Sequence, residues 1–145
     1  THSGADLRYL DPETNEKYLP YVIEPSVGLD RLLLAILVNS YTKEMVNDEE
    51  RVILKIHPAL APYKVTILPL IKKRHSEKAT DVYKMLSKEF SVSYDEAGSI
   101  GKRYRRGDAI GTPFSLTVDD NTIDNGTVTL RDRDTMEQVT LKLEF

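Results

Sequence analysis

The stretch KVTILPL, residues 64–70, decides the fold because it is a continuous apolar run of the length of one strand. Such a run is typical of a strand that is covered on both faces of its sheet. Residues 76–90 follow with helical periodicity: charged residues occupy one side, and the apolar side carries Ala79, Val82, Tyr83, Leu86 and Phe90. The pattern predicts a buried strand followed by a helix that packs on it.

Shorter strands and a second helix are predicted downstream. SVSYD (91–95) alternates as a short strand, and GSIGKRYRRG (98–107) can form a short helix that Ser99 caps and Gly107 ends. Three stretches then alternate with period two: FSLTVD (114–119), TVTLRD (127–132) and EQVTLKLEF (137–145). The order β-α-β-α-β-β-β predicts an α/β fold, with a mixed five-stranded sheet and helices packed on it.

The N-terminal part has a different pattern. RYLDPETNEKYLPYVIE (8–24) predicts two extended segments around a Pro-Glu-Thr-Asn turn, and residues 29–41 predict a helix that is apolar nearly all round. Residues 42–62 are first charged and then rich in proline, which indicates a connection. We therefore divide the chain into a remnant of another domain (1–45), a connection (46–63) and a complete domain (64–145). The first part is too small to bury its helix, so a longer parent protein is expected.

Composition limits the classes of function. The chain has 145 residues, a net charge of −3 and no cysteine, so Cys-ligated zinc is excluded and any nucleic-acid contact needs a local basic patch. The N-terminal residues are polar, and the longest apolar run, 32–38, is far short of the roughly 20 residues that span a membrane. A soluble cytoplasmic protein is expected, with no membrane partner.

The stretch EPSVGLDRLLLAIL, residues 24–37, carries polar groups that a plain core element does not need. Glu24 and Ser26 would point to the same face of an extended segment. Arg31 lies in the first turn of the predicted helix, where the helix dipole disfavours a cation. A bound polyphosphate would supply the reason, and pairing of Arg31 with Asp30 or Glu24 is the structural alternative.

Two groups of basic residues are candidates for nucleic-acid binding. The first surrounds Tyr104 and consists of Lys102, Arg103, Arg105 and Arg106, a combination that suits single-stranded RNA. The alternative is a solvated helix in which Tyr104 packs inward beside Ile100. The second group is Arg131 and Arg133, which share one face of a predicted strand and could read bases as well as phosphates.

Residues 24–37 resemble motif 3 of the class II aminoacyl-tRNA synthetases, in which Gly28, Asp30 and Arg31 match. Glu24 and Ser26 stand where the general motif has glycines, and the sequence Glu-Pro-Ser is similar to that of the dimeric glycyl-tRNA synthetases. The stretches YVIEPS, APYKVTILPL, GSIGKRYRRGDAIGTPF and TVTLRDRDTMEQ resemble the same branch. The resemblance covers nearly the whole chain.

The resemblance implies a C-terminal piece of a glycine–tRNA ligase, with an anticodon-binding domain at 64–145 whose charged face meets the anticodon loop of tRNA(Gly). Arg31 would hold the phosphates of ATP, and Glu24 and Ser26 would hold the ammonium of glycine and narrow its pocket. The parent would be a homodimer that uses ATP with Mg²⁺, and DNA is not an expected partner. No residue of this piece is assigned as catalytic, and alone it should catalyse neither activation nor transfer. The competing interpretation is a synthetase-like accessory or interaction module without enzymatic activity.

Three other motifs carry no functional prediction. GSIGK lacks the spacing and the following Ser or Thr of a P-loop. RGD at 106–108 is interpreted as a coincidence. His2, His57 and His75 are too scattered for a metal site, so they are interpreted as surface or packing residues.

Overall fold

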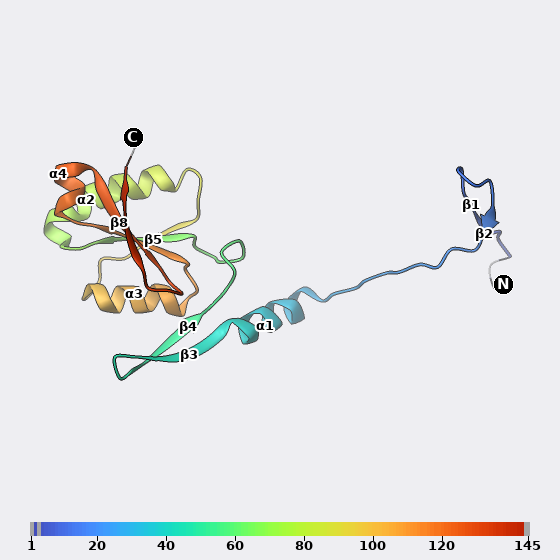
Figure 1. The fold of residues 1–145 in the computed structure, drawn as a ribbon, viewed down its shortest axis with the longest axis horizontal. Helices are drawn as coiled ribbons and strands as arrows, with labels where there is room; N and C mark the ends of the chain where they lie inside the picture. The colour runs from blue at the N-terminus through green and yellow to red at the C-terminus, as the bar shows by residue number, and fades with distance from the viewer. Residues whose placement is uncertain (1, 3, 144–145) are drawn as a thin grey trace. The chain divides into compact units, whose positions relative to one another are not determined.

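The strand predicted at 64–70 is present as β5 (Val65–Pro69), and all five of its residues are buried in the computed structural model, which describes residues 2 and 4–143. β5 lies second in a five-stranded sheet of order β6-β5-β7-β8-β9 (Figure 1). The other strands are β6 (Val92–Tyr94), β7 (Phe114–Val118), β8 (Thr127–Asp132) and β9 (Gln138–Lys142). β5 is parallel to both of its neighbours, whereas β7, β8 and β9 pair antiparallel. The predicted mixed sheet is confirmed; residues 144–145 of the predicted last strand lie outside the described residues.

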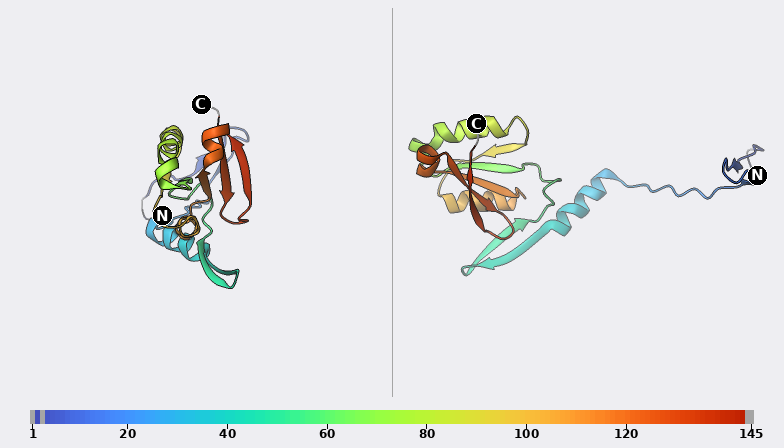
Figure 2. Two further views of the ribbon diagram at one scale, coloured as in Figure 1. Left: turned by 90° about the vertical axis from the view of Figure 1, so that its left-hand side faces the viewer. Right: turned by 45° about the horizontal axis from the view of Figure 1, so that its top comes forward.

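One face of the sheet carries the hydrophobic core. α2 (Lys72–Leu86) and the short helix α4 (Asp120–Asn125) cover this face, and α3 (Ile100–Ala109) covers the other (Figures 1 and 2). The core on the α2 side consists of Val65, Ile67, Ala79, Val82, Val92, Leu116, Val118 and Val128. α2 begins at Lys72, four residues before the predicted start. The first turn was not predicted because it carries no apolar side chain that would show helical periodicity. Phe90 was predicted inside the helix but lies beyond its end, half exposed.

The sheet face under α3 is polar. Thr66 and Ser93 join their hydroxyls at 2.5 Å across neighbouring strands, and Tyr104 of α3 bonds the Thr117 hydroxyl at 2.6 Å. Gly107 faces this side of the sheet, and a Cβ there would lie in ordinary contact, 3.9 Å from the Ser115 and Thr66 hydroxyl oxygens. The prediction that Gly107 ends the helix is wrong, because α3 continues to Ala109.

A hairpin occupies much of the segment that the sequence indicated as a connection. β3 (Tyr41–Val46) and β4 (Glu49–Leu54) pair antiparallel over their whole length. Asn47 and Asp48 form the turn with φ of 50° and 62°, the left-handed conformation that a two-residue hairpin turn requires. The high charge of this stretch concealed two regular strands.

The chain divides within helix α1 (Leu29–Ser40) into two units, Thr1–Leu32 and Leu33–Phe145. In the first unit, β1 (Tyr9–Leu10) and β2 (Lys17–Tyr18) pair antiparallel around a turn, as predicted, and residues 19–28 form no helix or strand. α1 follows the predicted bounds to within one residue, and most of its leucines are exposed. Among residues 2 and 4–143, no helix is both long and apolar enough to cross a membrane.

Candidate nucleic-acid interface

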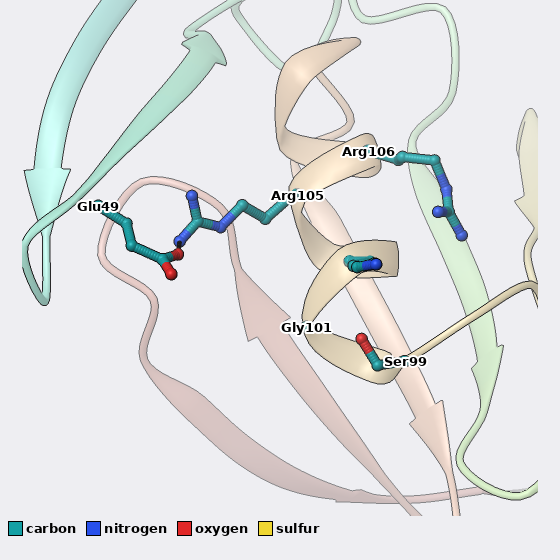
Figure 3. A pocket seen from close by; sticks show the side chains of 6 residues that line it. Glu49, Ser99, Gly101, Arg105 and Arg106 are labelled. Carbon is teal, nitrogen blue, oxygen red and sulfur yellow. Dashed lines mark hydrogen bonds and ion pairs between the residues drawn. The ribbon is translucent and has the colours of Figure 1, made fainter.

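The outer side of α3 carries an open depression of about 570 Å³ (Figure 3). It is lined by Glu49, Ser99, Gly101, Lys102, Arg105 and Arg106. Ser99 is the N-cap residue of α3, as predicted, although its side chain makes no capping hydrogen bond. Three cations of one helix therefore surround a surface that a ligand can reach.

These three cations differ in their partners. Lys102 is exposed and has no hydrogen bond or ion pair within the described part of the chain. Arg105 donates to the Glu49 carboxylate at 2.6 Å and to the Glu50 carbonyl at 2.9 Å. Arg106 points to the other side of the helix, where its Nε donates to Asp95 at 2.8 Å (Figure 3). The side chains of Arg105 and Arg106 remain 40% and 49% exposed.

Arg103 belongs to the predicted basic patch, but the structure does not place it on the surface. Only 5% of Arg103 is exposed. Its Nε donates to the Gly98 carbonyl at 3.1 Å, and another guanidinium nitrogen donates to the Pro69 carbonyl. Arg103 therefore fastens α3 to the end of β5. Tyr104 also points inward, as the structural alternative predicted.

Arg131 and Arg133 are buried as well, at 7% and 2% exposure. Arg131 donates to Asp108 at 3.0 Å, and its guanidinium carbon lies 4.7 Å from the centre of the Tyr104 ring. Arg133 donates to the carbonyls of Gly111 and Ile56 at 2.8 and 3.1 Å. Neither side chain presents its guanidinium group to solvent, contrary to the expectation of a charged face that meets RNA.

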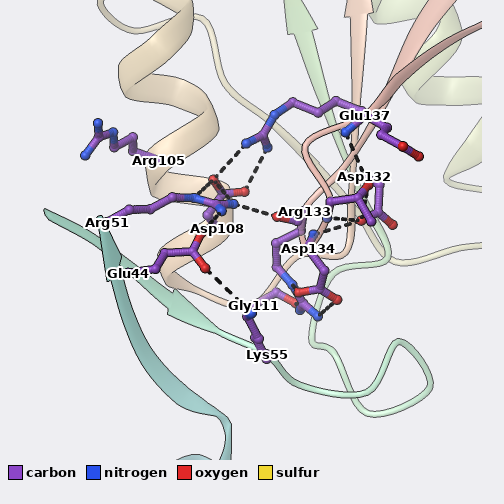
Figure 4. A network of polar contacts seen from close by, with 12 residues as sticks. Glu44, Arg51, Lys55, Arg105, Asp108, Gly111, Asp132, Arg133, Asp134 and Glu137 are labelled. Atoms are coloured by element: carbon purple, nitrogen blue, oxygen red, sulfur yellow. Dashed lines mark hydrogen bonds and ion pairs between the residues drawn. The ribbon is translucent and has the colours of Figure 1, made fainter. Parts of the chain in front are cut away.

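Asp108 is the centre of a network that joins three parts of the second unit (Figure 4). Arg51 of β4 donates to one oxygen of Asp108 through two nitrogens, at 3.0 and 2.8 Å. Arg51 also donates to the Arg133 carbonyl at 2.6 Å and pairs with Glu44 of β3. In the network, the cations of Arg51, Arg131 and Arg133 pair with the carboxylates of Glu44, Asp108 and Asp134, and Lys55 also lies 3.6 Å from Glu44. Pairing of this kind is what makes buried charges tolerable.

Neither Arg51 nor Asp108 was predicted from the sequence as part of a site. A signal for Arg51 existed, because residues 49–54 alternate so that Arg51 shares a buried face with Ile53. The pair Asn47-Asp48 is a further hairpin signal. Asp108 was hidden in the RGD tripeptide, and no sequence pattern pairs it with an arginine 57 residues away.

Glu24 and Ser26 lie in the stretch without regular structure that precedes α1, and Arg31 lies in the first turn of α1. All three are exposed, and within the described residues no hydrogen bond or ion pair joins them to one another. Pairing of Arg31 with Asp30 or Glu24 is likewise not seen there. Their functional assignments stay predictions.

His57 and His75 make local structural contacts. His75 is fully buried; its Nδ1 accepts from the Ile71 backbone N–H at 2.9 Å, and its Nε2 lies 2.8 Å from Asp120. His57 Nδ1 accepts from the Ala59 N–H at 3.2 Å. In the part of the chain that the structure describes, no group of three His, Cys, Asp or Glu residues is arranged to hold a metal ion.

Comparison with curated proteins identifies close relatives. A glycine–tRNA ligase of Clostridium tetani is 58% identical over 144 residues, which are 99% of this chain and 31% of the relative. The ligase of Clostridium perfringens is 60% identical over 148 aligned positions, with coverage of 99% and 32%. The ligase of Bacillus cereus strain ZK is 56% identical over 142 residues, with coverage of 98% and 31%. The chain thus spans about a third of the length of these relatives, and its resemblance to glycyl-tRNA synthetases is confirmed.

A solved structure and a sequence family also match this chain. The crystal structure of the RNA binding domain of threonyl-tRNA synthetase from Cryptosporidium parvum Iowa II is 31% identical, with a TM-score of 0.56. The similarity covers 61% of this chain and 22% of that chain. The family described as Anticodon binding domain matches residues 64–145, which include all five strands of the mixed sheet and helices α2 to α4. The chain therefore belongs to the anticodon binding domain family.

Proposed function

We propose that the chain is part of a glycine–tRNA ligase and that residues 64–145 bind the anticodon loop of tRNA(Gly). The family match and the names of the relatives support the class of RNA. The observation that carries the proposal is the accessible cationic surface of α3, formed by Lys102, Arg105 and Arg106 in a chain of net charge −3. A local patch of this kind is what a chain without overall positive charge needs to bind RNA.

The proposed RNA contacts involve fewer residues than the basic residues of the sequence suggest. Lys102 can receive a phosphate directly. The guanidinium groups of Arg105 and Arg106 are 40% and 49% exposed, and an ion pair of an exposed group contributes only about 0–1 kcal/mol, so a phosphate oxygen can replace Glu49 or Asp95. The buried arginines at 103, 131 and 133 are left out of the contact set, because their guanidinium groups bond inside the protein.

The rest of the proposal concerns the whole ligase. Arg31 holds the phosphates of ATP, because an arginine can bind phosphate in a bidentate manner. The Mg²⁺ of the reaction enters bound to ATP. Glu24 holds the ammonium of glycine, and Ser26 narrows the pocket so that a substrate side chain does not fit. The ligase activates glycine, transfers it to tRNA in the cytoplasm and acts as a homodimer. Residues 1–145 contribute binding groups to these steps and no catalytic residue.

The test measures binding of two anticodon stem-loops that differ only in the anticodon, one of them with the glycine anticodon. The full chain of residues 1–145 is titrated at several salt concentrations. Three phosphate contacts predict a log–log salt slope of about −2, taking roughly 0.7 per contact for single strands. Replacing Lys102, Arg105 and Arg106 by alanine should flatten this slope and weaken binding of both loops.

A control removes equal charge from another surface. The control residues are three exposed lysines in or directly after α2: Lys73, Lys84 and Lys88. α2 covers the opposite side of the sheet from α3. Replacement of the three lysines by alanine should leave most of the affinity and nearly all of the slope. Equal effects of the two triple variants would refute the α3 surface. Identical binding of both loops by the unaltered chain would instead favour a module that does not read the anticodon.

A further inference from the structure

Arg51 lies outside the residues that the family matches, yet its side chain is buried against the matched domain. Only 2% of Arg51 is exposed. Its guanidinium group donates to Asp108, to the Arg133 carbonyl and to Glu44, so every nitrogen of the fork has a partner (Figure 4). An arginine bound in this way fixes the geometry of its neighbours, because a planar fork tolerates little displacement.

The principal partner of Arg51 belongs to the helix that carries the proposed RNA surface. Asp108 lies in the last turn of α3 and is 2% exposed. A carboxylate is unfavourable at a helix C-terminus and costly to bury without partners. Arg131 satisfies Oδ1 at 3.0 Å, whereas the closest contacts of Oδ2 come from Arg51. The orientation of the end of α3 thus depends on a residue of the hairpin.

A second contact ties the hairpin to the middle of α3. Arg105 donates to Glu49 and to the Glu50 carbonyl, both in β4. The hairpin itself is fastened at its base, where the Lys55 N–H donates to the Ser40 carbonyl at 2.7 Å. Ser40 is the last residue of α1, and β3 begins at the next residue. The hairpin is therefore a short, hydrogen-bonded link between α1 and α3.

We propose that Arg51 is a positioning residue for RNA binding: through Asp108 it holds α3 in the orientation in which Lys102, Arg105 and Arg106 meet the RNA. The inference rests on the proposed function, and it assigns part of the RNA affinity to a residue that no phosphate contacts.

The experiment compares variants of the full chain for binding of the anticodon stem-loop. Arg51→Lys keeps a positive charge beside Asp108 but loses the fork, and Arg51→Met removes the charge. We expect Arg51→Lys to weaken binding about tenfold, the loss typical of one misplaced charge-assisted contact, and Arg51→Met to weaken it more. Lys43→Met is the matched control, because Lys43 belongs to the same hairpin and pairs with Glu50 at an exposed position. The control should bind within about twofold of the unaltered chain.

A second readout separates positioning from general loss of structure. The Arg51→Lys change is repeated in the chain whose three α3 cations are already alanine. If Arg51 acts through those cations, the change should cause no further loss of the remaining RNA affinity. If Arg51 acts independently of them, Arg51→Lys should weaken binding by the same factor in both chains. Thermal unfolding of each variant verifies that binding is measured on folded protein. If Arg51→Met does not fold, the RNA affinity of Arg51→Lys tests the positioning role. If Arg51→Lys does not fold either, the RNA affinity of Glu44→Gln tests it, because Glu44 pairs with the other side of the Arg51 guanidinium group and is 27% exposed.

The outcomes separate the two proposals. Folded Arg51→Lys protein that binds RNA as tightly as the unaltered chain would overturn the positioning role and leave the proposed function intact. An equal loss in the presence and absence of the α3 cations would overturn it as well. An unaltered chain that binds neither stem-loop would overturn the proposed function, and the positioning role with it.

Discussion

Replacing Gly111 by alanine probes the same link between hairpin and domain through packing. Gly111 lies between α3 and β7 with φ of +85°. A Cβ at this position would lie 2.9 Å from Ile56 Cδ1 and 3.1 Å from the Leu54 carbonyl oxygen. The first distance is shorter than real Cβ contacts, and the second involves backbone that cannot turn away. The alanine methyl would therefore require the Ile56 side chain to move and the Leu54 carbonyl at the end of β4 to shift by a few tenths of an ångström.

The loss of stability in Gly111→Ala has two parts, which a second glycine of the chain can separate. A left-handed conformation costs an L residue about 1–2 kcal/mol, and overpacking adds about 1–3 kcal/mol. Gly111→Ala should therefore lower the free energy of unfolding by about 2–5 kcal/mol. Gly98→Ala is the matched control: its φ is +76°, but no atom lies within 4 Å of the new Cβ, so only the first part applies. Gly101→Ala, in the open first turn of α3, should instead stabilise by about 0.4–1 kcal/mol.

Urea unfolding of the three variants measures these differences, provided that the dependence on urea concentration is the same for each. The midpoint of thermal unfolding should shift by roughly 2–4 °C per kcal/mol for a chain of this length. The informative quantity is the difference between Gly111→Ala and Gly98→Ala, because it isolates the contact with Ile56 and Leu54. If the two variants lose the same stability, residues 54–56 do not pack on the domain as described, and the positioning role of the hairpin loses its basis.

Three further predictions address other sites. In the whole ligase, Arg31→Ala should slow glycine-dependent ATP–pyrophosphate exchange about ten- to a hundredfold, the value of one charge-assisted contact, and unchanged exchange by folded protein would remove Arg31 from the site. Glu24→Gln should raise the KM for glycine far more than the KM for ATP, and equal effects would indicate a role in folding. The hydrogen bonds from Arg133 hold the pKa of Asp134 below its ordinary value of 3.8, so this group stabilises the fold above that pH and the stabilisation is lost as the pH falls further. Asp134→Asn should therefore flatten the decline in unfolding free energy below about pH 4, and an unchanged acid limb would contradict the pairing.

Local periodicity was sufficient to predict most of the fold. β5 is buried on both faces because helices cover both, and α2 shows its apolar face at helical spacing. The hairpin at 41–54 was not predicted because the high charge of this stretch indicated a connection, although residues 49–54 alternate and the pair Asn47-Asp48 is a turn signal. The six-residue helix α4 escaped because its start depends on a reciprocal cap between Asp119 and Thr122 in a stretch that otherwise indicates a turn.

The candidate site was less predictable, for a reason visible at Arg131. Alternation shows which residues of a strand share a face, but it does not show which face another element covers. Arg131 shares its side of the sheet with small polar residues such as Ser115 and Thr117, a combination typical of a solvent-facing surface. α3 covers that surface and encloses the charge, so that only 7% of Arg131 is exposed. Only the contact between distant segments decides the matter.

The free energy of breaking each arginine's ion pair within the protein decides which cations can bind RNA. To use Arg131, an RNA would have to remove it from Asp108, and leaving a buried charge without its partner costs about 3–5 kcal/mol. To use Arg105, it would only have to replace Glu49 in an exposed pair worth about 0–1 kcal/mol. One phosphate contact to a charged group contributes about 1.5–3 kcal/mol, which exceeds the second cost and not the first. RNA binding can therefore recruit the outer cations of α3, and the inner arginines contribute by holding that helix in place.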